Sequence, residues 1–230
     1  MIYNLVNKYL MHDFTSGIAD ELNKKNHKET LKIIDIGCYR GNFSRNLKKK
    51  IKQKADFFLF DPNPNLKIDD FNYVKLAFSN EIGLKTFYLN TFFPAAGSSL
   101  KTIFYDDRVW NFTRKLFTGN FNKKYTTLKV NTDTLDNYCQ KNKIKKIDVL
   151  KIDTEGSEIE VLEGAKNILK NTDILLTEVL DTKKAFEKKY IKIIDFLEKK
   201  YNFKKVSEKK IRSVETLSNM RAMDLMFKNQ

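Results

Sequence analysis

The sequence predicts an α/β fold built on a mostly parallel sheet, and two observations carry this prediction. Short apolar runs rich in β-branched and aromatic residues recur along the chain, with helical periodicity between several of them. Acidic residues stand near the carboxyl ends of four runs: Asp35, Asp61, Asp153 and Glu178. Because parallel strands end at one edge of a sheet, these carboxylates are expected to gather in one site.

The first strand leads into a glycine turn and then a helix. Residues 31–36 form the apolar run, Gly37 and Gly41 follow, and apolar residues then recur at helical spacing to about residue 53. The Gly-x-x-x-Gly spacing differs from the dinucleotide fingerprint. Asp35 would repel a phosphate, so the turn favours a cationic or hydroxyl-bearing ligand, although such turns also occur without any ligand.

The second strand, residues 57–60, ends at Asp61, about 20 residues past the glycine turn. An acidic side chain there hydrogen-bonds ribose hydroxyls in nucleotide-binding folds. The alternative is a turn-former within Asp-Pro-Asn-Pro, but the spacing favours the ligand. A third strand, residues 73–77, leads to Ser79, which this arrangement brings within reach of an adenine edge. Residues 84–89 alternate as in a hairpin arm.

We expect one domain over residues 1–230, with an amino-terminal segment, residues 1–28, that is helical in two pieces, the second over residues 17–26. Residues 91–125 lack periodicity and indicate an insertion that serves as a lid or acceptor loop, with ordinary packing as the alternative. A strand over residues 127–130 and a helix over 132–140 follow.

The carboxyl-terminal half opens with a strong strand, residues 147–152, which ends in Asp-Thr-Glu-Gly. Ser157 is expected to cap the next helix, whose apolar face continues to Leu169. A strand over residues 174–179 carries Glu178 near its end. The remaining expected elements are a long helix through residues 186–197 and strands over residues 203–206 and 223–227.

Composition excludes several classes of protein. With 41% hydrophobic and 13% aromatic residues the chain is globular, and it has no apolar run of about 18 residues that would span a membrane. Cys38 and Cys139 show no CxxC pattern, and the amino terminus does not resemble a secretory signal, so we expect reduced thiols and a cytoplasmic protein. His12 and His27 are the only histidines, which argues against a histidine-based metal site or a Ser-His-Asp triad.

The formal net charge of +14 raises the alternative of an RNA-binding or RNA-methylating protein. Only six of the basic residues are arginines, however, against 37 lysines spread along the chain. Arginine is the favoured residue for bidentate phosphate and base recognition. We therefore interpret the charge as a lysine-rich background and do not expect a nucleic-acid partner.

The motifs resemble those of FkbM-type S-adenosylmethionine-dependent methyltransferases, and the resemblance covers about residues 31–179. Its most specific part is the Lys-Ile-Asp-x-Glu-Gly-x-Glu core. The matching segments are IIDIGCYRGNFS (33–44), FFLFDPNP (57–64), TLDNY (134–138), IDVLKIDTEGSEIEVLEGA (147–165) and LLTEV (175–179). The resemblance implies a class I methyltransferase (Rossmann-like) fold, a seven-stranded sheet with an antiparallel last strand and helices on both faces.

The implied reaction is methylation of a hydroxyl on a sugar, polysaccharide or natural product, with a small-molecule or glycan acceptor. A non-catalytic cofactor-binding subunit is a further alternative. By resemblance, Asp35, Gly37 and Gly41 would cradle the methionine end of S-adenosylmethionine, and Asp61 would bind its ribose. The chain departs from the family in having Asp61 where Glu is common, and Cys38-Tyr39 inside the glycine turn.

By the same resemblance, Asp153 and Glu155 would face the methyl group and the acceptor. An acceptor hydroxyl must lose a proton, which Asp153 or Glu155 is placed to take, with Lys151 as an orienting partner. We expect no metal, although Asp153 and Glu178 are an alternative pair of ligands for a divalent cation. Glu158 is interpreted as stabilising the start of its helix.

Overall fold

The computed structural model describes residues 14–24, 29–90, 98–102, 125–211, 215–216 and 218–230. The helices are α2 (Thr15–Lys24), α3 (Asn42–Lys50), α5 (Leu135–Lys141), α6 (Glu158–Glu163), the 3-10 helix η1 (Ile168–Asn171) and α7 (Phe186–Tyr201). The strands are β1 (Leu31–Ile36), β2 (Ala55–Phe60), β3 (Asn72–Val74), β4 (Ala77–Phe78), β5 (Gly83–Asn90), β6 (Tyr125–Asp133), β7 (Ile147–Ile152), β8 (Thr172–Thr182), β9 (Phe203–Lys210) and β10 (Met220–Asn229).

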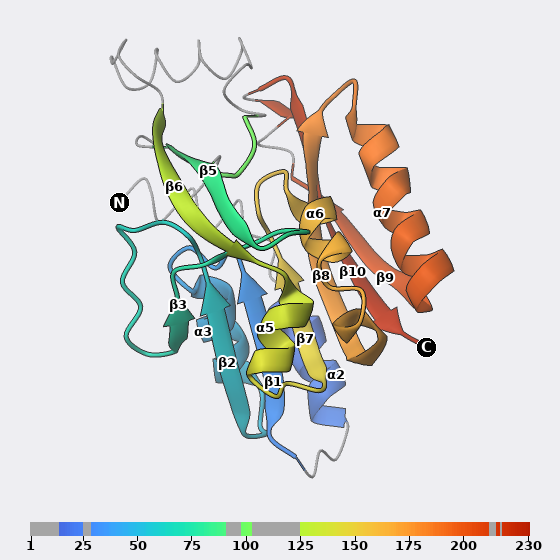
Figure 1. Ribbon diagram of the computed structural model, residues 1–230. Coiled ribbons are helices and arrows are strands. Elements are labelled where there is room, and N and C mark those ends of the chain that lie inside the picture. Colours follow the sequence, from blue (N-terminus) through green and yellow to red (C-terminus); the bar gives the residue numbers. More distant parts are fainter. Residues whose placement is uncertain (1–13, 25–28, 91–97, 103–124, 212–214, 217) are drawn as a thin grey trace.

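Seven strands form the main sheet in the order β3-β2-β1-β7-β8-β10-β9 (Figure 1). The first five pair in parallel, and β10 is antiparallel to both β8 and β9. The last strand is therefore the antiparallel one, which confirms the expected class I methyltransferase topology. The chain runs outward from β1 to β3 and returns on the other side of β1 as β7, so the strand order reverses between β1 and β7. Ligands of such sheets bind beyond the strand ends at this switch point.

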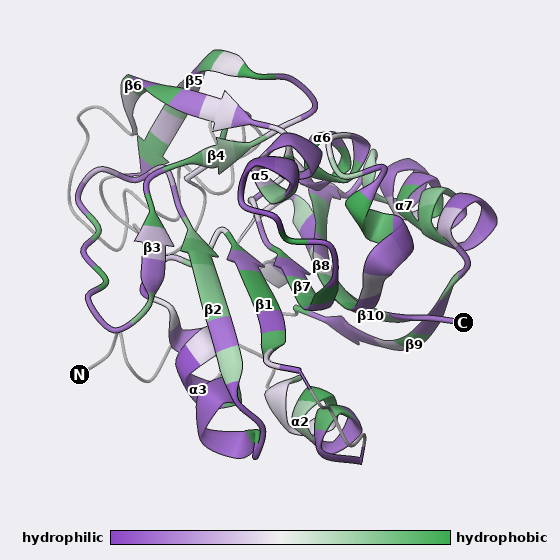
Figure 2. Cartoon of the chain, turned by 60° about the horizontal axis from the view of Figure 1, so that its bottom comes forward, coloured by the Kyte–Doolittle hydropathy of each residue, from purple (hydrophilic) through white to green (hydrophobic). Residues whose placement is uncertain are grey.

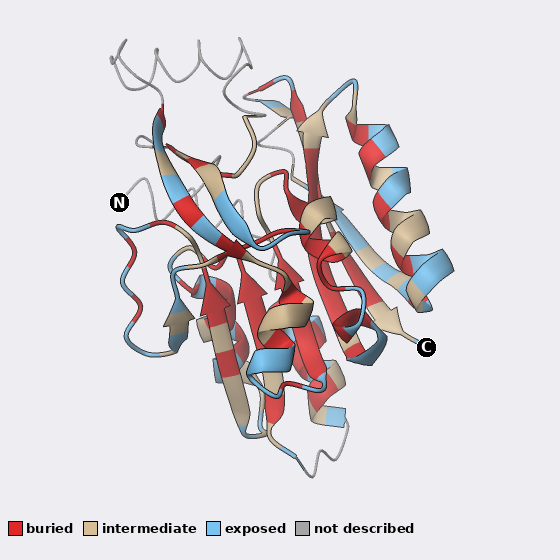
Figure 3. Cartoon of the chain, viewed as in Figure 1, coloured by how far each residue is buried: buried red, intermediate tan, exposed pale blue. Residues whose placement is uncertain are grey.

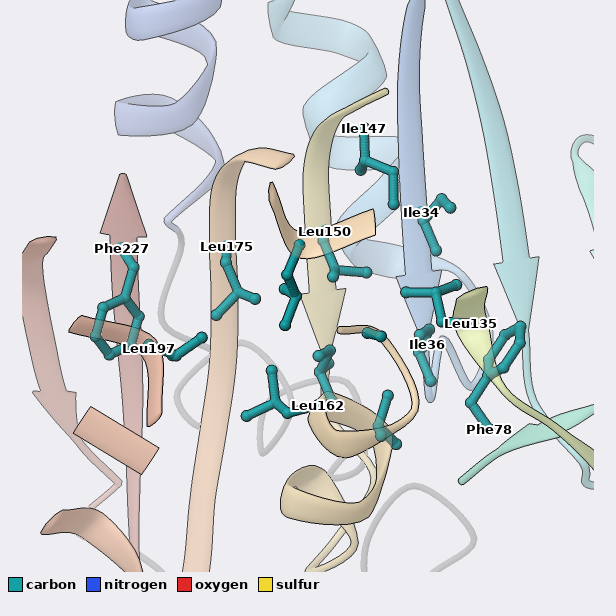
Figure 4. Close-up of a cluster of buried hydrophobic side chains, with 14 of the residues drawn as sticks. Ile34, Ile36, Phe78, Leu135, Ile147, Leu150, Leu162, Leu175, Leu197 and Phe227 are labelled. Carbon is teal, nitrogen blue, oxygen red and sulfur yellow. The ribbon is translucent and has the colours of Figure 1, made fainter. Parts of the chain in front are cut away.

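Helices cover both faces of the sheet, with α2 and α3 on one side and α5, α6 and α7 on the other (Figure 2). Alternation along β1 divides the core: Ile34 and Ile36 pack toward α5 and α6, whereas Leu31 and Ile33 pack toward α2 and α3. Figure 4 shows part of the first cluster, which continues across the sheet to Phe227. The central strands are buried along almost their whole length (Figure 3).

A smaller sheet in the order β4-β6-β5 lies across the carboxyl ends of the central strands (Figures 1 and 2). The predicted strand over residues 84–89 is confirmed within β5, which pairs antiparallel to β6, but β6 begins only at Tyr125, so the two strands do not form a tight hairpin. β4 pairs parallel to β6. The predicted strand over residues 73–77 is wrong as a single element. The Leu76 N–H bonds to the Val74 carbonyl at 3.0 Å, and this tight turn passes Ala77 into the second sheet.

Several helix boundaries also differ from the prediction. The segment predicted as a helix over residues 132–140 begins two residues inside β6, and α5 starts only after Thr134, whose Oγ1 accepts the Asn137 N–H at 3.1 Å. α3 ends at Lys50, and α2 begins at Thr15. α6 ends at Glu163, so Leu169 belongs to η1 instead.

Some predictions concern residues outside the described ranges. These include the first helical piece of residues 1–28 and most of the insertion over residues 91–125. The single-domain organisation over residues 1–230 stays a prediction. Among the described residues, none of the helices combines the length and apolarity needed to cross a membrane.

Candidate functional site

A row of three charged side chains crosses the switch point. Asp35 on β1 is the register partner of Lys151 on β7, and both side chains are buried. The Lys151 Nζ lies 3.4 Å from Asp35 Oδ1 and 3.0 Å from Asp153 Oδ2. On the other side, the Ser44 hydroxyl of α3 donates to Asp35 Oδ2 at 2.7 Å. Lys151 therefore bridges two carboxylates that belong to the two halves of the sheet.

Burial and charge act in opposite directions on this row. Burial raises the pKa of Asp35, and the Lys151 ammonium opposes that shift. Burial alone would lower the pKa of Lys151, but Asp153 and Asp35 outweigh it, so the net shift is upward. Lys151 is therefore a fixed cation near neutral pH, which suits an orienting partner and excludes a proton acceptor.

The glycine turn is shaped by its contact with the end of β7. Gly37 has φ +73°, and a Cβ there would lie 1.7 Å from the carbonyl oxygen of Asp153. Gly41, at φ +75°, lies against Leu59 of β2. Glycine is therefore required at residue 37 because two backbone segments approach each other there. A ligand would have to approach the turn from the side that does not face Asp153.

Asp61 lies at the tip of β2 and connects two loops. Its Oδ2 accepts the Tyr39 N–H at 3.0 Å, and its Oδ1 accepts the Asn63 N–H at 2.9 Å. Burial raises the pKa of Asp61 to about 6, although both N–H groups favour the ionised form. The negative charge of Asp35 raises it further, so Asp61 and Asp35 belong to one electrostatic environment.

Ser79 lies farther along, where the small sheet meets the main one. It is buried, and its hydroxyl is 2.8 Å from the Lys85 Nζ and 3.2 Å from Asn80 Oδ1. Its carbonyl lies so close to Gly164 that a Cβ on that glycine would come within 2.1 Å. Its proposed contact with adenine stays a prediction.

Three carboxylates, called the acidic cluster below, lie on the other side of Lys151. Asp153, Glu155 and Glu178 each offer an oxygen, and these oxygens lie within 4.8 Å of one another. Glu178 is buried, and its Oε2 has no hydrogen-bond partner among the described residues. Burial raises the pKa of Glu178 well above its usual value, and the charges of Asp153 and Glu155 raise it further.

Two residues that the sequence reasoning missed contribute to this region. Asp224 of β10 is the register partner of Glu178, and burial together with Asp153 raises its pKa to about 7. Ser99 is buried, pairs with Tyr88 of β5 through the backbone, and donates its hydroxyl to the Thr154 carbonyl at 2.9 Å. Ser99 therefore ties the small sheet to the turn that follows β7.

The charges and the open acceptors define which ligand fits. Among the described residues at the strand ends, Asp35, Asp153 and the other members of the acidic cluster are acidic. The one cation among them is Lys151. Glu178 Oε2 is a buried oxygen without a hydrogen-bond partner among the described residues, whereas Asp35 Oδ1 lacks one there but is ion-paired with Lys151 Nζ at 3.4 Å. Such a site suits a ligand that carries positive charge and donates hydrogen bonds. The oxygen atoms of the acidic cluster would also suit a divalent cation.

Comparison with known proteins identifies relatives of one kind. A family model described as the methyltransferase FkbM domain matches residues 35–205. A 2-O-methyltransferase, NoeI of Sinorhizobium fredii, is 26% identical over 165 residues, which is 65% of this chain and 63% of the relative. The chain thus matches less than two thirds of that relative's length.

Among solved structures, an FkbM methyltransferase from Methylobacillus flagellatus is similar over 97% of this chain and 57% of that one, at 9% identity and a TM-score of 0.48. The plantazolicin methyltransferase BpumL, solved in complex with SAH, covers 100% of this chain and 88% of its own, at 11% identity and a TM-score of 0.46.

Proposed function

The chain belongs to the FkbM methyltransferase family, and from this premise we propose that it transfers a methyl group from S-adenosylmethionine to a hydroxyl of a sugar, polysaccharide or natural product. The observation that carries the proposal is the acidic cluster of Asp153, Glu155 and Glu178. Its oxygens lie within 4.8 Å of one another beside the switch point. The name of NoeI, a 2-O-methyltransferase, supports a hydroxyl as the acceptor.

In this proposal residues at the ends of β1 and β2 would hold the cofactor. Asp35 and the turn of Gly37 and Gly41 would hold the methionine end, where the buried Asp35 carboxylate, ion-paired with Lys151 at 3.4 Å, would also accept a hydrogen bond from the positively charged amino group. Asp61 accepts hydrogen bonds from the ribose hydroxyls while it keeps its two backbone donors. Ser79 contacts the adenine edge.

The bound sulfonium supplies a methyl group that is already activated for displacement. The protein's task is therefore to align the acceptor oxygen and to remove its proton. Asp153 takes that proton on its carboxylate, and the Lys151 Nζ at 3.0 Å fixes the orientation of this carboxylate. Glu155 faces the acceptor hydroxyl and is the second candidate base. When bound, S-adenosylmethionine would supply the methyl group to the deprotonated acceptor oxygen, and its sulfur would leave as a neutral thioether.

A divalent cation is the alternative use of the same carboxylates. Asp153, Glu155 and Glu178 would hold it, and it would lower the pKa of the acceptor hydroxyl. We expect the metal-free route, because Lys151 already supplies a fixed positive charge beside Asp153.

The test is the substitution Asp153→Asn. We expect methyl release onto a panel of hydroxylated sugars to fall by about 10²-fold or more, since general-base catalysis contributes at least that much. Calorimetry should show S-adenosylmethionine affinity that remains measurable. Glu187→Gln, which changes an exposed carboxylate on α7, is the matched control and should leave turnover unchanged.

Three outcomes would contradict parts of the proposal. Full turnover by Asp153→Asn removes this residue from the chemistry. Loss of wild-type turnover in EDTA that Mg²⁺ restores would favour the metal route. Binding of S-adenosylmethionine without methylation of any hydroxyl would favour a non-catalytic subunit.

A further inference from the structure

The turn that follows β7 holds Glu155 in an unusual backbone conformation. Glu155 has φ +54°, in the left-handed region that residues with a Cβ disfavour, and Gly156 follows at φ +114°. Such a conformation persists only where surrounding contacts enforce it. Because Glu155 supplies one of the three carboxylates, whatever enforces the turn also sets the geometry of that group.

Glu158 holds the turn on both sides of Glu155. Its side chain is fully buried, and its Oε1 accepts the Thr154 N–H at 3.2 Å, the Thr154 hydroxyl at 3.1 Å and the Gly156 N–H at 2.8 Å. These bonds reach back to Thr154 and Gly156, which precede the helix, so Glu158 does more than offset the dipole at the helix start. The interpretation of Glu158 from the sequence is therefore too limited.

Lys189 of α7 completes the arrangement. Its Nζ is buried and donates to Glu158 Oε2 at 2.7 Å, to the Gly156 carbonyl at 2.8 Å and to the Leu180 carbonyl at 2.9 Å. All three ammonium protons are thus used. Burial would raise the pKa of Glu158, but Lys189 and the N–H donors outweigh it and the net shift is downward, so the pair is ionic.

The contact with Leu180 links the two chain segments that supply the acidic cluster. Leu180 lies two residues beyond Glu178 on β8, while Asp153 and Glu155 come from the turn after β7. A single buried ion pair therefore connects the turn, β8 and α7. A buried pair of this kind costs desolvation, and a merely stabilising contact could be replaced by apolar residues.

We propose that Glu158 and Lys189 are positioning residues, which fix Asp153 and Glu155 relative to Glu178 and thereby set the rate of methyl transfer. This rests on the proposed function. The hydrogen bonds of Glu158 and Lys189 go to Thr154, Gly156 and Leu180 and not to Asp35 or Asp61, so we expect a larger effect on turnover than on cofactor affinity.

The test uses Glu158→Gln and Lys189→Met, with Lys192→Met as the matched control. Lys192 joins the same two helices, α7 and α6, through an exposed pair with Glu163 at 3.3 Å. For folded Lys189→Met and Glu158→Gln we expect kcat to fall by about 10- to 100-fold, because small misplacements of reacting groups have effects of that size. The Kd for S-adenosylmethionine should change by less than about threefold. Lys189→Arg, which keeps the charge, should retain more turnover than Lys189→Met.

Hydrogen exchange of the peptide over residues 153–157 supplies a readout that does not depend on turnover. We expect faster exchange at Thr154 and Gly156 in Glu158→Gln and Lys189→Met, and no change in Lys192→Met. Unchanged kcat with only a lower Tm would overturn the proposal, as would equal losses of kcat and cofactor affinity. If the wild type methylates no acceptor, the proposed function fails. The exchange result then still decides whether the pair fixes the turn.

Discussion

At the scale of single residues, Asp61 serves two loops at once. Its two oxygens accept backbone N–H groups from the loop after β1, at Tyr39, and from the loop after β2, at Asn63. Tyr39 has φ +46°, a conformation that this hydrogen bond supports. A carboxylate has about four acceptor positions, so two remain for ribose hydroxyls. Asp61 therefore connects the two loops, and under the proposed function its remaining acceptor positions bind the ribose.

Replacing Asp61 by Asn should weaken cofactor binding by about 10-fold or more, because a hydrogen bond to a charged acceptor is lost and an N–H group loses its partner. The wild-type affinity should also fall as the pH is lowered through about 6, since the pKa of Asp61 is raised to that value and protonation removes its charge. Calorimetry between about pH 5 and pH 8 measures both effects.

The sign is opposite for the free protein. When the pKa of a carboxyl rises on folding, the folded protein becomes less stable as the pH rises toward that folded-state pKa. Ionised Asp61 therefore disfavours the folded apoprotein above about pH 6. Asp61→Asn should show no affinity step near that pH. A step that persists in this variant would assign the titration to another group.

Single residues also mark where sequence reasoning stops. Asp35, Asp61 and Asp153 could be predicted to meet because each stands at the end of an apolar run. Asp224 gave only a weak signal, an acid in a final strand, and its pairing with Glu178 depends on the antiparallel register of β10. Ser99 lies in a segment without periodicity, and its bond to Thr154 joins residues 55 positions apart.

At the scale of elements, the glycine turn and the end of β7 are built as one unit. Asp153 donates its N–H to the Ile36 carbonyl at 3.0 Å, and Gly37 lies directly against the Asp153 carbonyl. The position of the proposed base therefore depends on a residue without a side chain in a different element.

Gly37→Ala should destabilise the fold by about 3 kcal/mol or more, since the added Cβ combines left-handed strain with a backbone clash at 1.7 Å. Urea denaturation gives the free energy of unfolding. Gly17→Ala in α2 is the matched control: no atom lies within 4 Å of its added Cβ, and alanine should stabilise the helix by up to about 1 kcal/mol. A Gly37→Ala variant as stable as the wild type would refute this account of the turn.

Some helix and strand boundaries are set by the local sequence, and others by contacts between distant segments. β1 and β7 begin and end where the apolar runs do, because buried parallel strands read as continuous apolar segments. The split after Val74 depends on a turn between two sheets, which no local pattern encodes. α6 ends at Glu163, and the Gly164 that follows lies so close to the Ser79 carbonyl that a Cβ would not fit, a contact between distant segments.

At the scale of the whole molecule, the strand order explains why one edge of the sheet gathers the acids. The reversal between β1 and β7 leaves the helices on opposite faces and opens the strand ends to a ligand. Alternation of strands and helices predicts a parallel sheet but not its order. The seven-stranded sheet and its antiparallel last strand were expected from the family resemblance alone, and the observed topology confirms both.

The net charge of +14 is distributed differently from the site's own charge. Lysines lie on many elements, and several pair with neighbouring acids, as Lys24 does with Glu21 and Lys199 with Asp195. The group of Asp153, Glu155 and Glu178 is acidic instead. A polyanion would thus be attracted to the surface and repelled at the proposed reacting centre.

This contrast predicts how activity responds to salt. With a neutral hydroxylated acceptor, kcat/KM should change by less than about twofold between 50 and 200 mM salt, because no phosphate contacts are lost, whereas a protein that contacts several phosphates loses roughly 10³-fold in affinity. Steady-state kinetics and RNA filter binding over the same range provide the two measurements. Tight RNA binding that persists at the higher salt, together with methylation of that RNA and of no sugar, would replace the hydroxylated acceptor with a nucleic acid. Weak, salt-sensitive RNA binding without methylation is expected from the lysine surface alone.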